Sequence, residues 1–67
     1  MKSAEYVKTV NTFQIYVIQE GYVMRPSMTI VPLYVAIQPD CKLILTGIDL
    51  PDLIADVQEA FRNVKKQ

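Results

Sequence analysis

The chain has 67 residues, 51% of them hydrophobic and 21% charged, and its seven basic residues balance seven acidic ones. This length holds one domain, residues 1–67, and the zero net charge argues against nucleic acid or an anionic membrane as partner. With one cysteine and no histidine, the chain has neither an intrachain disulfide nor the usual zinc ligands. A core this small usually needs such a stabilising feature, and we therefore expect that self-association stabilises the fold.

The first third of the chain fits two different elements. A helix over residues 4–20 would start at a Ser3 N-cap and stop at Gly21, with one apolar stripe made of Tyr6, Val7, Val10, Phe13, Val17 and Ile18. A strand over residues 12–19 would instead point Phe13, Ile15 and Val17 to one side. We prefer the helix because it accounts for more residues and for both ends. A connector at residues 25–27 follows.

The segment 29–37 predicts a strand that is apolar on both faces. One face would carry Val31, Leu33, Val35 and Ile37, and the other Ile30, Pro32, Tyr34 and Ala36. A strand with one face in water alternates between apolar and polar residues instead. So short a chain has few elements to cover both faces, and we therefore expect a second copy or another protein to cover one of them.

A turn follows at residues 38–42, where Pro39 and Asp40 suit the centre of a type I turn. A three-residue loop would pair Ile37 with Leu43, and it would gather on one core face Leu33, Val35, Ile37, Leu43 and Leu45. The same loop would put Cys41 in the left-handed conformation and would leave Tyr34 on the uncovered face.

The end of the chain predicts a helix with well-marked ends. Its apolar residues recur at spacings of three and four, namely Leu50, Leu53, Ile54, Val57, Phe61 and Val64. Asp49 is placed as the N-cap and Pro51 lies in the first turn. Acidic residues come early and basic residues late, as the helix dipole favours.

No group of residues predicts catalysis, a cofactor or a metal ion, so we expect the protein not to be an enzyme. Cys41 has no histidine to serve as its base, and Asp40, Asp49 and Asp52 have local roles at a turn and a helix start. Thr46, Gly47 and Asp49 form a strand-to-helix corner whose backbone N–H groups offer a weaker case for a bound anion.

These patterns predict a small α+β domain in the order helix, β-hairpin, helix, with its sheet completed or covered by oligomerisation. Tyrosine, methionine and arginine are enriched at protein interfaces. The expected interface residues are Tyr34, Ile30, Pro32, Tyr22, Arg25 and Tyr16. Without a signal peptide or a membrane-spanning stretch, the expected location is cytoplasmic.

We expect a non-enzymatic homo-oligomer that inhibits or adapts an unidentified larger protein. Its small size also suits a protein encoded by a phage or another mobile element. The alternative is a small-molecule or nucleotide binder with a pocket between subunits near the corner of Thr46, Gly47 and Asp49.

Overall fold

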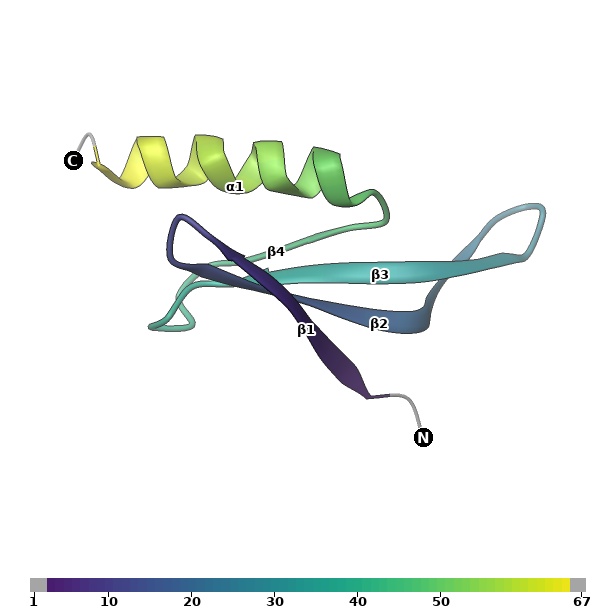
Figure 1. The fold of residues 1–67 in the computed structure, drawn as a ribbon. Coiled ribbons are helices and arrows are strands. Elements are labelled where there is room, and N and C mark those ends of the chain that lie inside the picture. The colour runs from purple at the N-terminus through teal and green to yellow at the C-terminus, as the bar shows by residue number, and fades with distance from the viewer. Residues whose placement is uncertain (1–2, 66–67) are drawn as a thin grey trace.

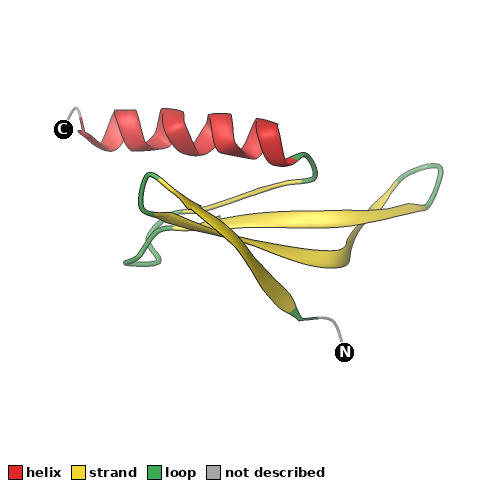
Figure 2. Cartoon of the chain, viewed as in Figure 1, coloured by secondary structure: helices red, strands yellow, loops and turns green. Residues whose placement is uncertain are grey.

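The computed structural model describes residues 3–65, with side chains described for residues 3–63. Four antiparallel strands form a sheet in the order β1-β2-β3-β4, and one helix packs on one of its faces (Figures 1 and 2). The elements in chain order are β1 (Ala4–Val10), β2 (Phe13–Met24), β3 (Thr29–Ile37), β4 (Ile44–Gly47) and α1 (Leu50–Lys65). The α+β class is confirmed, whereas the predicted order of helix, hairpin and helix is wrong.

The predicted helix over residues 4–20 is a β-hairpin. Val10 pairs with Phe13 across Asn11 and Thr12, whose φ angles of 48° and 75° are both positive, as a type I′ turn requires. The segments on either side are rich in β-branched residues, which lose side-chain freedom in a helix and pack well on a sheet. The alternative strand was therefore the better interpretation, and its residues Phe13, Ile15 and Val17 are all buried.

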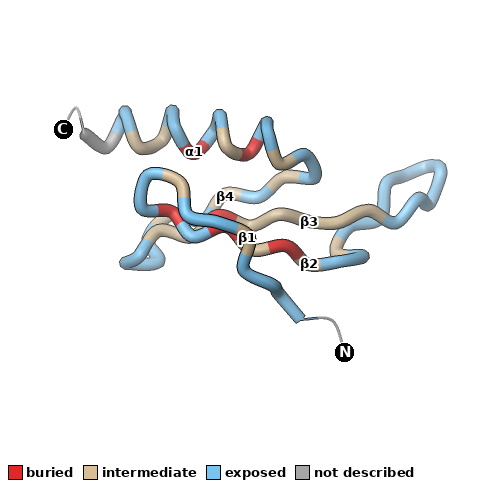
Figure 3. Tube along the Cα trace, viewed as in Figure 1, coloured by how far each residue is buried: buried red, intermediate tan, exposed pale blue. Residues whose placement is uncertain are grey.

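The core lies between the sheet and α1 (Figure 3). Its buried hydrophobic side chains in the described part of the chain are Phe13, Ile15, Val17, Ala36, Leu53 and Val57. The predicted C-terminal helix is confirmed, and Leu50, Ile54 and Phe61 of its apolar stripe pack against this core. The side chain of Val64 lies outside the described residues. Asp49 precedes the helix as predicted, and its backbone C=O accepts a hydrogen bond of 3.0 Å from the N–H of Leu53.

The predicted register of β3 and β4 is wrong by one residue. Ile37 pairs with Ile44 and Ala36 pairs with Leu45, because the Gln38 N–H donates to the Leu43 C=O across a four-residue loop. A shift of one residue exchanges the two faces of a strand. Ala36 and Tyr34 consequently face α1, and Tyr34 packs against the core instead of lying on the uncovered face.

Cys41 adopts the predicted left-handed conformation, with φ of 59°, in this longer loop. Replacing Cys41 with glycine should therefore raise the free energy of unfolding by about 1 kcal/mol, because glycine takes up positive φ without a Cβ clash. Urea denaturation measures this gain. Cys41→Ser keeps the Cβ and should leave the urea midpoint unchanged. An equal rise of the midpoint in both variants would show that the gain does not come from relief of the left-handed backbone conformation.

Candidate interaction surfaces

The face of the sheet that points away from α1 is apolar and has no described element over it. Phe13, Ile15 and Val17 face the helix, so their neighbours along β2 point to the opposite side. Residues that pair across antiparallel strands share a face, and β2 pairs there with β1 and β3. We call this surface the open face and define it by Tyr6, Tyr16, Ile18, Leu33, Val35 and Ile37.

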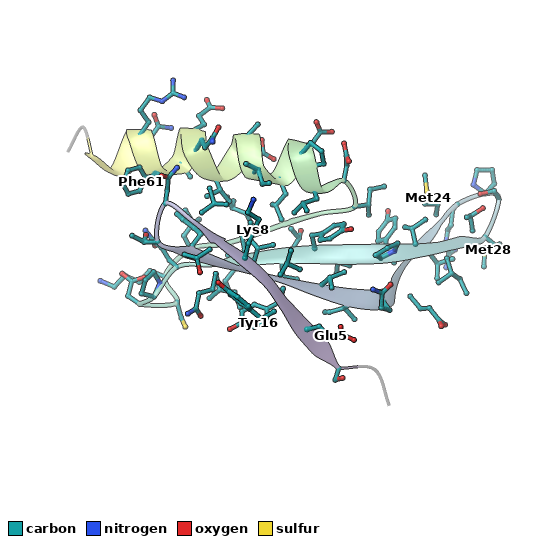
Figure 4. All side chains as sticks on the ribbon, in the orientation of Figure 1. Glu5, Lys8, Tyr16, Met24, Met28 and Phe61 are labelled. Atoms are coloured by element: carbon teal, nitrogen blue, oxygen red, sulfur yellow. The ribbon has the colours of Figure 1, made fainter. Side chains whose placement is uncertain are left out.

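The two tyrosines of the open face are held by their own chain. Their rings meet edge to face, with centroids 5.9 Å apart and an interplanar angle of 72°. The Tyr16 hydroxyl donates to the side-chain oxygen of Gln14 at 3.1 Å, and the hydroxyls of Tyr6 and Thr9 lie 2.6 Å apart. Tyr16 lies on the side of the sheet opposite Lys8 and the helix (Figure 4). The open face thus presents ordered aromatic rings and aliphatic side chains, with no charged group among its six residues.

A second apolar surface is the arm, which we define as residues 21–31. Here β2 and β3 extend beyond both neighbours, since β1 pairs with β2 only as far as Ile18 and β4 pairs with β3 only as far as Tyr34. The register of β2 shifts between Ile18 and Tyr22, and Glu20 there has a φ of 58°. The arm exposes large hydrophobic side chains on both of its faces, namely Tyr22, Val23, Met24, Met28 and Ile30.

The predicted interface residues do not form one patch. Tyr22, Arg25 and Ile30 belong to the arm, but Tyr22 pairs with Val31, so Tyr22 and Ile30 lie on opposite faces of it. Arg25 is the one charged residue between Gly21 and Ile37. Pro32 lies on β3 at the base of the arm, and Tyr16 lies on the open face. Tyr34 belongs to the packed side of the sheet.

The sequence interpretation missed the open face because it assigned Leu33, Val35 and Ile37 to the core and Tyr6 to a helix. The signal that identifies it is Asn11–Thr12 between two β-rich segments, because asparagine tolerates positive φ. With that turn, residues 4–10 form a strand, and α1 is then the one helix of the described residues that can cover the sheet.

The predicted ligand corner is acidic. Thr46 and Gly47 end β4, and Asp49 stands at the start of α1 with Asp52 close by. Partial desolvation, the charge of Asp52 and a side-chain hydrogen bond with Asp52 raise the pKa of Asp49 above its usual value of 3.8. Two carboxylates at this helix start repel an anion. The nearest basic residue along β2 and β3, Arg25, lies on the arm past the Met24–Thr29 pair, whereas Gly47 pairs with Tyr34.

The raised pKa of Asp49 predicts a pH dependence of folding. The folded chain binds the Asp49 proton more tightly than the unfolded chain, so this group stabilises the fold below pH 3.8, and the stabilisation is lost as the pH rises through the folded-state pKa. Asp52→Asn should reduce this dependence, because it removes the neighbouring charge. The measurement is the urea midpoint of both proteins from neutral pH to about pH 4. Asp56→Asn, measured in the same way, is the charge-matched control. Equal pH profiles for the wild type and both variants would show that Asp52 does not raise the pKa of Asp49.

The described residues form a surface without a pocket, and they contain no cluster of three or more potential metal-binding side chains. Within the same residues, no helix has the length and hydrophobicity needed to cross a membrane. No protein-family model, curated protein or solved structure matches the chain. The open face and the arm are therefore the features from which a function can be argued.

Proposed function

We propose that the protein is a small non-enzymatic interaction module that works as a homo-oligomer and inhibits or adapts a larger protein. The observation that carries this proposal is the amount of apolar surface that one copy leaves uncovered. Hydrophobic residues make up 51% of the chain, yet eight large ones among the described residues are exposed: Tyr6, Tyr22, Val23, Met24, Met28, Ile30, Ile44 and Ile48. Exposed apolar residues that gather in patches are typical of interaction sites.

The size of the surface supports the same proposal. The accessible area is 4960 Å², whereas a compact monomer of 7.6 kDa exposes about 4,300 Å². The radius of gyration is 12.8 Å, against about 11 Å for a compact domain of this length. One side of a standard protein interface buries about 800 Å². The excess area is close to what one such contact removes from water.

The two surfaces suit two different contacts. The open face has a broad, uncharged surface, as a second copy requires. The arm projects from the body and joins exposed tyrosine and methionine to a single arginine, a composition enriched where proteins bind other proteins. We assign self-association to the open face and the target protein to the arm.

Light scattering after size exclusion at micromolar concentration tests the oligomer. The expected mass is at or above twice 7.6 kDa, and a stable monomer would refute this part of the proposal.

Capture of proteins from the native host with the tagged chain tests the arm. A specific target should be lost with the double variant Tyr22→Ser and Ile30→Ser, and it should be retained with Gln58→Ser, which changes an exposed position of α1. Retention by the arm variant would show that the target binds elsewhere.

The alternative function, a small-molecule or nucleotide site at Thr46, Gly47 and Asp49, gains no support from the described residues. The corner carries two neighbouring carboxylates and no pocket. Calorimetric titration with phosphate and common nucleotides tests it directly, and heat of binding would favour the alternative.

A further inference from the structure

We infer that the second copy packs on the open face, so that the two sheets lie face to face and their edges remain unpaired. This inference rests on the proposed function and specifies its contact. Two copies of a sheet can associate in two ways: they can pair edge strands into one continuous sheet, or they can bury two faces against each other. The edges and the open face of this chain distinguish the two arrangements.

The free edge of β3 is blocked by Pro32. The N–H of Gln38 points toward β4, since it donates to the Leu43 C=O at 3.1 Å. Backbone N–H and C=O groups of successive residues point to opposite edges of a strand. Those of Ala36, Tyr34, Pro32 and Ile30 therefore point to the same edge as those of Gln38. β4 covers this edge only as far as Tyr34. Pro32 therefore places its missing N–H in the middle of the exposed part, where a pairing strand would need a donor.

The edge strands β1 and β4 are also poor templates for pairing. β1 contains a bulge between Tyr6 and Lys8, and a bulge interrupts the regular spacing of backbone donors and acceptors. It also carries the charged residues Glu5 and Lys8. β4 has only four residues. Short strands, bulges, charges and proline are the devices by which proteins prevent edge pairing.

The open face has the properties that a twofold contact needs. In such a contact the same patch meets itself, so any charged side chain near the axis would approach its own copy. The six residues of the open face include none, and the tyrosine rings are already ordered by their own chain. Val35 lies at the centre, between Tyr16 of β2 and Thr46 of β4. Figure 1 shows the tip of the arm rising toward the helix side of the sheet, away from the open face.

Two faces of this kind pack about 10 Å apart, with both helices on the outside. The arms then project from the pair and remain available to a target. Val35 would be buried close to the twofold axis.

The test is the mass of charge variants measured by light scattering at equal concentration. Val35→Asp should reduce a dimer of twice 7.6 kDa to a monomer. Gln58→Glu adds the same charge on the exposed side of α1 and should remain dimeric. Ile44→Asp is the second variant, because Ile44 borders the open face opposite Ile37 and is 54% exposed in one copy, so a charge there is compatible with folding. It should weaken the dimer at least tenfold.

Amide hydrogen exchange of the wild-type dimer separates the two arrangements without a variant. The N–H groups of Tyr6, Thr9 and Ile30 point away from the neighbouring strand and should exchange rapidly in a face-to-face dimer. Protection of these amides, or a dimer that survives both aspartate variants, would overturn the face-to-face arrangement and leave the proposed function standing. A monomeric wild-type protein would instead refute the homo-oligomer in the proposed function, on which this inference rests.

Discussion

Replacing Tyr34 with aspartate should unfold the protein, although Tyr34 is only partly buried. Tyr34 lies on the helix side of β3, opposite Val17 and Gly47, and it packs against the core. The substitution removes a large packed ring and places a carboxylate between sheet and helix. The combined cost is about 3 kcal/mol or more, which approaches the whole stability expected for a domain of this size.

Val35→Asp is the matched control, one residue away on the opposite face. Its side chain points away from the core, so the variant should retain its far-UV circular dichroism and a cooperative thermal transition. Tyr34→Asp should lose both. The reverse result, with Val35→Asp unfolded and Tyr34→Asp folded, would mean that the other face of β3 forms the core, as the three-residue loop predicts.

Which face of β3 packs against the helix could not be predicted from the sequence. The predicted three-residue loop (39–41) and the observed four-residue loop (39–42) after Gln38 both give apolar pairs, because β3 is apolar on both faces. A one-residue change in the loop exchanges the faces without violating any local preference. The position of α1 decides between them, since Leu53 and Val57 pack on the side that carries Ala36. The sequence pattern by itself does not contain that contact.

The N-terminal hairpin was missed for a related reason. Tyr6, Val10, Phe13 and Val17 recur at helical spacing, but they also fall on two strands joined by a tight turn. The turn uses Asn11 and Thr12, and threonine at a φ of 75° gives no sequence signal of a left-handed residue. By contrast, α1 was predictable because its cap, its stripe and its charges are all local to the segment.

The prediction that β3 has an uncovered apolar face agrees with the structure, whereas the prediction of which residues form that face does not. A strand that is apolar on both sides implies a cover on each, whichever side the helix takes. In the structure α1 covers one side and no described element covers the other. The sequence thus predicted that one face of β3 would be apolar and uncovered. In the structure that face carries Leu33, Val35 and Ile37, and not Tyr34.

Gly21→Ala should be much more damaging than the same change at the other glycine, Gly47. A Cβ on Gly21 would lie 2.8 Å from the backbone oxygen of Ile18 and 2.8 Å from the Cβ of Leu33. Backbone and Cβ atoms cannot rotate aside as the end of a long side chain can. The bulge between Ile18 and Tyr22 must therefore open, and we expect a loss of about 1–3 kcal/mol in the free energy of unfolding.

Gly47→Ala provides the control for this prediction. A Cβ on Gly47 would meet Leu53 at 3.7 Å, an ordinary contact, and neither glycine has a positive φ. Alanine there should leave the stability unchanged or raise it by about 0.4–1 kcal/mol, because it restricts the unfolded chain. Urea denaturation of both variants measures the difference. Since the bulge connects the arm to the sheet, Gly21→Ala should also increase amide exchange at Tyr22 and Val31, and equal midpoints for the two variants would show that the bulge adapts without cost.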